Sequence, residues 1–392
     1  MLKPIKRLGA IVAASGLILA GCSDAQQGAS TSEEAASKGN FTITDVAGRE
    51  VSLDKAPERV VLGEGRGVFA TGILNKEEPL EHVVALGSDL KSATPDYYKH
   101  FEQQFPKVND LPEIGSVKKG DVTVENLVSL DADLLLLTMD QYDAAKTTGL
   151  DKQMDDAGLK YAMIDFRQHP IENTTRSMAI FGKVFGHEDK AEEFNDQWQK
   201  VVDEVKEKAA KGEGKRTFLW RAAGISDCCG TWNDANIGEL INFAGGKNLG
   251  DEVLDAESGA VTPEKVLEMQ PEAIIATGGD WGSKVGKDGA VGYIALGYDI
   301  DQAKAQASVD KAVELQPGFD QLKAFEDGTF HAMWHQFYNS PFNYVALLQI
   351  AKWVNPDHFK DVDVDAAWSE SQEQYSPIGD EGTFFSTAKA SK

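Results

Sequence analysis

The stretches "DVTVENLVSLDADLLLLT" at residues 121–138 and "AVTPEKVLEMQPEAIIAT" at residues 260–277 follow one plan. Each has Val-Thr, then a glutamate and apolar residues at helical spacing, and each ends in a short apolar run. Threonine is a good helix N-cap and an acid suits the first turn, whereas a short apolar run is typical of a buried strand. The sequence therefore predicts the same helix and strand twice, in a fold made of two related halves.

The rest of the chain continues this alternation. Short apolar runs such as "RVVLG" and "YAMID" in the first half, and "RTFLW" and "FHAMW" in the second, are separated by stretches with helical spacing. Strands that alternate with helices form parallel sheets covered by helices, and 392 residues exceed what one hydrophobic core usually supports. We expect an α/β fold of two Rossmann-like lobes, at 40–170 and 187–392, joined by an interdomain helix at 171–186.

The N-terminus has the pattern of an export signal. A positively charged start, "MLKPIKR", precedes an apolar stretch that is too short to cross a bilayer as a stable helix. The following "LAGC" ends at Cys22 and resembles the lipobox of bacterial lipoproteins, which implies a membrane anchor on the Cys22 thiol. A plain secretory signal is the alternative. We expect residues 1–22 to be a signal peptide and residues 23–39, which lack apolar periodicity, to be a flexible tether.

The charge of the chain bears on its partners. Acidic residues outnumber basic ones by 63 to 39, which gives a formal net charge of −24 at pH 7. Nucleic acid is disfavoured as a partner, because a protein of this charge gains nothing from the release of counterions. A chain this negative has to concentrate its few cations at one place if it binds an anion.

Three arginines follow predicted strands directly. Arg66, Arg167 and Arg221 lie where open α/β sheets bind ligands, beyond the carboxyl ends of strands. Guanidinium groups hold carboxylate or catecholate oxygens in pairs, so the pattern indicates an anionic ligand. A surface salt bridge is the alternative for each arginine. Four further side chains are expected to line the site, with the aromatic rings as flat walls: Trp232, Trp281, His335 and Tyr338. Core packing is the alternative for the tryptophans.

Two adjacent cysteines lie in the segment that follows Arg221. In an oxidising compartment Cys228 and Cys229 either form a vicinal disulfide or stay as thiols. A thiolate metal site is disfavoured, because two neighbouring sulfurs without a third clear ligand do not complete a tetrahedral set. We therefore expect no direct metal ligand in this loop.

From Phe41 to about Pro377 the chain resembles the iron-siderophore and vitamin B12 group of periplasmic-type substrate-binding proteins of ABC importers. The resemblance rests on "FTITDVAGREVSLDKAPERVV", on the two repeated stretches, on "IGELINFAGGKNL" and on the closing "FEDGTFHAMWHQFYNSPFNYVALLQIAKWVNPDHF". It implies two lobes joined by one long helix, little hinge closure and a ligand cleft between the lobes. It also implies that Glu125 and Glu264 dock onto arginines of a dimeric permease. Stabilisation of the helix dipole is their alternative role.

The resemblance and the candidate residues together predict a lipid-anchored extracytoplasmic receptor that captures an anionic ferric siderophore and passes it to the permease. Arg66, Arg167 and Arg221 would hold the anionic groups. Such a receptor is expected to be a monomer, with no catalytic residue and no cofactor other than its iron-chelate ligand. The same scaffold also suits haem or a corrinoid. A redox-active extracytoplasmic enzyme that uses Cys228 and Cys229 is an alternative from another class.

Overall fold

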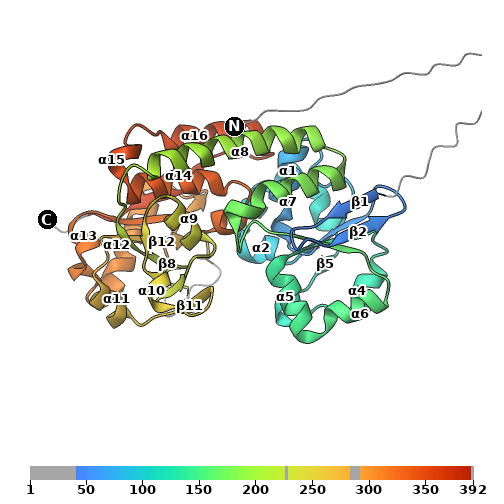
Figure 1. Cartoon of the computed structure of the whole chain (residues 1–392), viewed down its shortest axis with the longest axis horizontal. Coiled ribbons are helices and arrows are strands. Elements are labelled where there is room, and N and C mark those ends of the chain that lie inside the picture. Colours follow the sequence, from blue (N-terminus) through green and yellow to red (C-terminus); the bar gives the residue numbers. More distant parts are fainter. Residues whose placement is uncertain (1–40, 226–227, 283–291, 390–392) are drawn as a thin grey trace, which may run out of the picture. The chain divides into compact units, whose positions relative to one another are not determined.

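The computed structural model describes residues 41–225, 228–282 and 292–389, and it contains two α/β lobes, each built on a five-stranded sheet (Figure 1). The predicted fold class is thereby confirmed. The signal peptide, the tether and Cys22 lie outside the described residues.

The sheet of the N-terminal lobe is parallel throughout, in the order β5-β4-β3-β6-β7. Its strands are β3 (Val60–Leu62), β4 (Val83–Gly87), β5 (Glu113–Ile114), β6 (Leu134–Thr138) and β7 (Tyr161–Ile164). An antiparallel hairpin precedes them, formed by β1 (Phe41–Thr44) and β2 (Glu50–Leu53). Every residue of β3, β6 and β7 is buried, as expected for parallel strands that are covered on both faces.

The sheet of the C-terminal lobe has the order β10-β8-β12-β14-β16, and only the edge strand β16 runs antiparallel to its neighbour. Its strands are β8 (Arg216–Trp220), β10 (Lys247–Asn248), β12 (Ala273–Gly278), β14 (Phe330–Trp334) and β16 (Phe385–Thr387). Two antiparallel ribbons flank this sheet. They pair β9 (Gly230–Trp232) with β11 (Ser258–Ala260), and β13 (Gly297–Tyr298) with β15 (Gly382–Thr383).

Helices cover both sheets. Those of the first lobe are α1 (Val68–Leu74), α2 (Asp89–Ala93), α3 (Pro95–Gln104), α4 (Val124–Ser129), α5 (Met139–Thr148) and α6 (Leu150–Asp156). Those of the second lobe are α9 (Ile237–Phe243), α10 (Gly250–Val253), α11 (Pro263–Met269), α12 (Gln302–Leu315), α13 (Lys323–Glu326), α14 (Asn343–Val354), α15 (Pro356–Phe359) and α16 (Val364–Tyr375). Short 3-10 turns are η1 (Gly65–Gly67), η2 (Pro106–Asp110), η3 (Val117–Lys119), η5 (Phe319–Gln321) and η6 (His335–Asn339). Among the described residues, no helix combines the length and the apolar character needed to cross a membrane.

The repeated unit forms as the sequence predicts. Thr123 Oγ1 accepts a hydrogen bond from Asn126 N at 3.3 Å, and Thr262 Oγ1 accepts one from Lys265 N at 3.3 Å. Pro263 stands in the first turn of α11, where a missing N–H costs nothing. The helices α4 and α11 then lead into the fully buried strands β6 and β12. Both copies therefore begin with the same cap and end in the same kind of strand.

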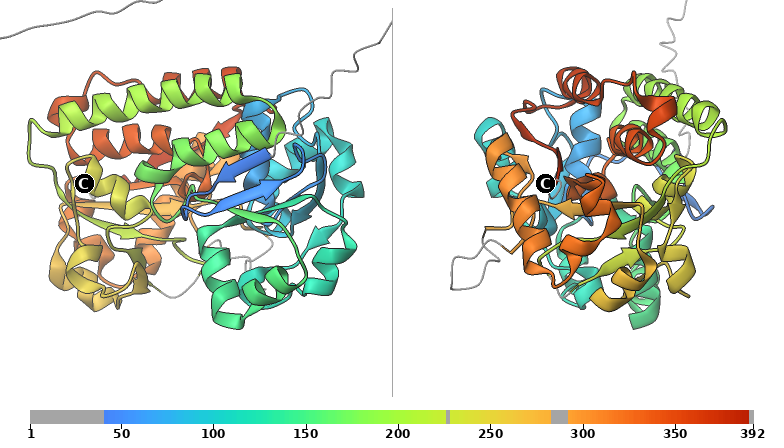
Figure 2. Two further views of the ribbon diagram at one scale, coloured as in Figure 1. Left: turned by 45° about the vertical axis from the view of Figure 1, so that its right-hand side comes forward. Right: turned by 90° about the vertical axis from the view of Figure 1, so that its left-hand side faces the viewer.

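Two helices connect the lobes. The first, α7 (Pro170–Phe185), contacts both β7 and α9. The second, α8 (Glu188–Ala209), contacts α1 of the first lobe and α14 and α15 of the second. Figures 1 and 2 show α8 lying along both lobes. The connection between the lobes therefore includes α8, which the sequence analysis assigned to the C-terminal lobe.

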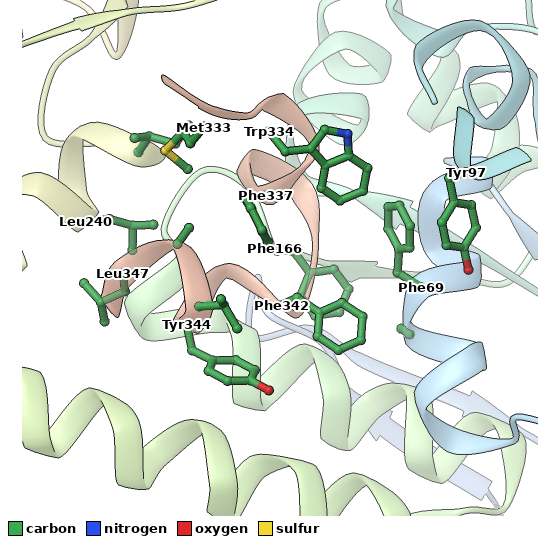
Figure 3. Close-up of a cluster of buried hydrophobic side chains, with 14 of the residues drawn as sticks. Phe69, Tyr97, Phe166, Leu240, Met333, Trp334, Phe337, Phe342, Tyr344 and Leu347 are labelled. Atoms are coloured by element: carbon green, nitrogen blue, oxygen red, sulfur yellow. The ribbon is translucent and has the colours of Figure 1, made fainter. Parts of the chain in front are cut away.

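Aromatic side chains pack where the lobes meet (Figure 3). We call this contact, made by Phe69, Tyr97, Tyr298 and Trp334, the aromatic seam. The ring of Phe69 lies 4.5 Å from Tyr97 and 6.2 Å from Trp334, while Tyr298 lies 5.8 Å from Tyr97 and 5.6 Å from Trp334, all between centroids. Such pairs each contribute roughly 0.5–1.5 kcal/mol beyond the burial of apolar area. The seam therefore resists separation of the two sheets at this place.

A buried carboxyl group lies beside the seam. Asp96 is 4% exposed, and its Oδ2 accepts a hydrogen bond from Tyr298 N at 3.1 Å. A Cβ at Gly297, where φ is 119°, would overlap Asp96 Oδ2 and Trp334 Nε1, so only glycine fits there. Burial raises the pKa of Asp96 to about 7, although a hydrogen bond from the Tyr97 backbone opposes the shift.

This raised pKa predicts how the stability depends on pH. The pKa of Asp96 is higher in the folded protein than in an unfolded chain. The contribution of Asp96 to the free energy of unfolding is therefore fully present below about pH 4 and is lost as the pH rises through 7. The variant Asp96→Asn keeps an oxygen acceptor for Tyr298 N and cannot ionise. Urea unfolding at several pH values should show that, between pH 4 and 8, the free energy of unfolding falls by roughly 4 kcal/mol more in wild type than in the variant. Parallel pH profiles would contradict the assignment.

Candidate functional site

The candidate ligand residues come together between the lobes, at the carboxyl ends of strands of both sheets. Arg66 lies in η1 after β3, Arg167 follows β7, and Arg221 follows β8. Trp281 follows β12, and η6 after β14 carries two more candidates. The ends of parallel strands are the usual ligand-binding edge of such sheets. The full set, linked by the contacts described next, is Arg66, Arg167, Arg221, Trp232, Trp281, His335 and Tyr338.

Tyr338 is the centre of this cluster. The guanidinium carbons of Arg66 and Arg167 lie 5.0 Å and 4.9 Å from the centroid of its ring. The ring of Trp232 stacks on Tyr338 at 6.0 Å, and the ring of His335 lies 4.4 Å away. Tyr338 therefore joins two arginines of the N-terminal lobe to two rings of the C-terminal lobe.

The remaining two candidates attach to the rim of the cluster. The guanidinium carbon of Arg221 lies 5.0 Å from the ring of Trp232, and Trp281 packs edge-on against His335 at 5.3 Å. His335 Nδ1 lies 2.8 Å from Thr277 Oγ1 at the end of β12. Trp232, the last residue of β9, and Trp281, which follows β12, are each 4% exposed. A role in ligand binding stays a prediction for all seven residues.

Arg66 already has a complete set of partners. Its Nε lies 2.8 Å from Asp89 Oδ2, Nη2 pairs with Glu64, and Nη1 donates to Gln336 Oε1 at 3.0 Å and to the Tyr338 hydroxyl at 2.6 Å. Burial opposes the charge of Arg66, but Glu64 and its other partners hold its pKa above the ordinary value. The charge of Arg66 is therefore balanced inside the protein.

Arg167 is balanced in the same way. Its Nη1 lies 2.9 Å from Asp140 Oδ2, and Lys118 pairs with the same oxygen. Burial works against ionisation of Asp140, but Arg167 and Lys118 lower its pKa to about 2. Asp140 is therefore a carboxylate at neutral pH and holds the two cations together at the edge of the cleft.

Arg221 differs from the other two arginines. Within the described part of the chain no carboxylate lies at ion-pair distance from it, and its guanidinium group lies over the face of Trp232. Burial, and then the nearby charge of Arg167, lower the pKa of Arg221. Of the three arginines, Arg221 has the charge that an added anionic group would balance.

A cavity adjoins the cluster. It has a volume of about 110 Å³ and lies between side chains of both lobes. Its lining includes Lys118, Asp140, Arg167, Trp232, Asn236 and Glu257. Pockets for drug-sized ligands are usually about 300–1,000 Å³. This cavity is smaller than that range, and two of the seven candidates, Arg167 and Trp232, line it.

The comparisons with known proteins identify the family. The sequence profile of the family described as "Periplasmic binding protein" matches residues 75–328. The chain belongs to this family. It is 25% identical, over 326 residues that make up 79% of this chain and 94% of the relative, to the uncharacterized ABC transporter substrate-binding lipoprotein YvrC of Bacillus subtilis. It is also 27% identical over 313 residues, 76% of this chain and 88% of the relative, to the iron(3+)-hydroxamate-binding protein FhuD of the same species.

A solved structure agrees with this assignment. The TroA-like periplasmic binding protein FepB from Veillonella parvula superposes with a TM-score of 0.79 at 25% identity, covering 89% of this chain and 100% of that one. The chain is accordingly an extracytoplasmic substrate-binding protein of an ABC transporter, which binds a small molecule and works with a permease. Members of this family are transport receptors rather than enzymes.

Three residues of the binding protein's cleft were missed by the sequence reasoning. Asp140 lies two residues after β6, in the first turn of α5, so its position near a strand end was an available signal. Lys118 lies in η3, within the segment that joins β5 to α4, and pairs with Asp140 of α5. No local sequence pattern indicates this pairing. Asn236 precedes α9, and nothing in its neighbourhood marks it as a cleft residue.

The two cysteines of the binding protein are joined as a vicinal disulfide. Cys229 is fully buried, and its N–H donates to Val261 O at 2.7 Å while Val261 N donates back to Cys229 O at 3.0 Å. Val261 immediately precedes Thr262, the cap of α11. The disulfide loop is therefore attached to the start of the second repeated helix. In the described ranges no group of three or more His, Cys, Asp or Glu side chains is arranged around a metal position.

Proposed function

We propose that this binding protein captures a ferric siderophore outside the cytoplasm and delivers it to the permease of an ABC importer. The observation that supports the proposal is the meeting of Arg167, Arg221 and the Trp232–Tyr338 stack at one edge of both sheets. Cationic groups beside aromatic faces suit a bulky chelate that presents oxygen atoms on an organic scaffold.

The charge balance favours a chelate of low net charge. Two cations, Lys118 and Arg167, and two carboxylates, Asp140 and Glu257, line the cavity. Beside it, Arg66 pairs with Glu64 and Asp89, and Arg221 has no carboxylate at ion-pair distance among the described residues. Three hydroxamates neutralise Fe³⁺, whereas three catecholates leave a chelate of charge −3. A neutral ferric hydroxamate therefore fits this balance better than a strongly anionic chelate. The similarity to the iron(3+)-hydroxamate-binding relative supports the same ligand class.

Ligand titration tests this proposal. Gly39–Lys392 form one compact unit, and Trp232 and Trp281 report on the cleft by fluorescence. Ferrichrome, a neutral trihydroxamate chelate, should quench this fluorescence saturably at micromolar concentrations, and a ferric tris-catecholate should bind more weakly. Arg221→Gln should weaken ferrichrome binding about tenfold or more, as expected for a lost hydrogen bond to a charged group.

The matched control is Arg216→Gln. Arg216 lies at the opposite end of β8, where it pairs with Glu252 at 3.3 Å. This variant should bind ferrichrome like wild type. Haem and cobalamin are titrated alongside. Failure of every iron chelate to bind would refute the proposal, and saturable binding of haem or cobalamin alone would assign the cleft to that ligand instead.

A second part of the proposal concerns the permease. Glu125 and Glu264 are exposed near the starts of α4 and α11, and neither is ion-paired within the described residues. Hydrogen bonds from the backbone N–H of each glutamate, and then from the threonine cap, lower the pKa of both carboxyls. Figure 1 shows α4 and α11 on the same side of the two lobes, opposite α8. One partner is therefore able to contact both carboxylates.

Apolar side chains accompany these glutamates. Val128, 49% exposed, lies one turn after Glu125, and Leu315, 44% exposed, lines a groove of about 530 Å³ together with Pro263, the neighbour of Glu264. They are the two exposed large hydrophobic residues in the described ranges. We therefore propose that each lobe offers the permease a carboxylate next to an apolar contact.

The docking proposal predicts a loss of uptake without a loss of ligand affinity. In the double variant Glu125→Ala and Glu264→Ala, iron-chelate uptake by cells should fall at least about tenfold, because paired interfacial charges set orientation and association rate. Ferrichrome affinity should stay at the wild-type value. The control variant Glu204→Ala and Glu207→Ala removes two exposed carboxylates from α8 and should transport normally. Uptake that falls only in step with thermal stability would leave helix stabilisation as the role of the glutamates.

Membrane attachment is the third part of the proposal. Cys22 lies outside the described residues, and the lipoprotein character of the YvrC relative supports lipidation at this position. Cells fed labelled palmitate should yield labelled wild-type protein, whereas Cys22→Ser should be unlabelled and released from the membrane fraction. Equal labelling of both proteins would exclude Cys22 as the anchor.

A further inference from the structure

Glu257 is a carboxylate that the structure holds beside the candidate ligand residues of both lobes. Its backbone oxygen accepts a hydrogen bond from Asn233 N at 3.0 Å, and its Oε2 accepts one from Gln168 Nε2 at 3.1 Å. Asn233 is the chain neighbour of Trp232 in the C-terminal lobe, and Gln168 is that of Arg167 in the N-terminal lobe. The position of Glu257 is therefore tied to one candidate residue of each lobe.

The strand that follows Glu257 places it against the aromatic wall. Ser258, the first residue of β11, pairs with Trp232, the last residue of β9, in the antiparallel ribbon of these strands. Glu257 and Ser258 line the cavity of about 110 Å³, together with Arg167 and Trp232. Glu257 is nevertheless an exposed residue, so its carboxylate is open to an added partner.

The cations of the protein do not neutralise Glu257. Lys118 and Arg167 line the same cavity, but both pair with Asp140. Among the residues that the structure describes, no cation lies at ion-pair distance from Glu257, and Arg221 makes no ion pair with it. Arg221 and Glu257 are thus two charges of opposite sign that the described side chains leave unbalanced.

Two unbalanced charges of opposite sign suit a ligand with the reverse polarity. Hydroxamate oxygens that coordinate Fe³⁺ keep a partial negative charge and accept hydrogen bonds from a guanidinium group. A carboxylate has only acceptors, and an ammonium group has only donors with a full positive charge. A ligand that has both groups presents the oxygens of its neutral iron core to Arg221 and its ammonium group to Glu257. An anionic chelate brings a like charge to Glu257 instead.

We propose that Glu257 recognises a protonated amine on the chelate, so that the preferred ligand is a ferric trihydroxamate that carries an ammonium group. The proposal rests on the ferric hydroxamate site proposed above and narrows its ligand to one subclass. The formal net charge of the chain, −24 at pH 7, also favours the approach of a cationic chelate. Glu257 is then a specificity-determining residue, which selects the amine and leaves the iron core to the arginines and the rings.

A pair of chelates isolates the ammonium group. Ferrioxamine B is a linear ferric trihydroxamate with a protonated amine at one end, and its N-acetyl derivative has the same iron core without that charge. In tryptophan fluorescence titrations, wild type should bind ferrioxamine B about tenfold more tightly than the acetyl derivative, the gain expected for a hydrogen bond between charged groups. Because Glu257 is exposed, this preference should shrink when the salt concentration rises from about 0.05 to 0.5 M.

The variant Glu257→Gln tests the residue itself. Its amide oxygen still accepts a hydrogen bond from Gln168 Nε2, so only the charge is removed. The variant should bind the two chelates equally, with the wild-type affinity for the acetyl derivative. The matched control is Glu252→Gln, which removes the same charge beside Arg216, at the end of β8 opposite the cleft. This control should keep the preference for ferrioxamine B.

The outcomes separate the ammonium site from the ligand assignment. Equal wild-type affinity for the two chelates, or a preference that Glu257→Gln retains, would overturn the ammonium site and leave the ferric hydroxamate assignment standing. Binding of ferrichrome without either ferrioxamine would do the same. An equal loss of affinity for both chelates in Glu257→Gln would make Glu257 part of the cleft wall and not a selector of the amine. If no ferric hydroxamate bound, the proposed function would fall, and the ammonium site with it.

Discussion

The packing of Trp334 against Phe69 and Tyr298 is the constraint on which the rest of the structure depends. These rings join the two lobes, and each is nearly completely buried. Separating them exposes aromatic surface to water, which is costly. The lobes therefore cannot swing apart freely.

Two of the arginines in the cleft are paired with carboxylates inside the protein. Burying a guanidinium without a partner is expensive, and Arg66 and Arg167 avoid that cost through carboxylates on neighbouring strand ends. The acids are thus part of the site rather than competitors for it. They keep the arginines ionised and oriented while limiting the net charge that a ligand experiences. At the proposed ligand site, a chelate would then be selected by the arrangement of its oxygens and its shape more than by its total charge.

Sequence reasoning succeeded where the signals are local. Thr123 and Thr262 by themselves indicate where two helices begin. Apolar runs indicate the strands, and the ends of these strands bring Arg66, Arg167 and Arg221 together. It failed where the structure depends on distant partners. The pairing of Arg167 with Asp140 follows from the adjacency of β6 and β7, and the role of α8 as a second bridge follows from its packing on α14. The left-handed backbone of Asn236 leaves no signature in a sequence at all.

The last helix of the chain completes the first lobe. α16 packs on α1, Lys76 Nζ donates to Glu373 O at 2.5 Å, and Gly72 lies so close to Pro377 that a side chain would not fit between them. The apolar face of α1 in the first lobe is therefore not covered until the C-terminal segment has packed against it. A chain that crosses a membrane unfolded, N-terminus first, would remain incompletely folded until almost all of it had emerged. Its topology thus delays compaction until export is nearly finished.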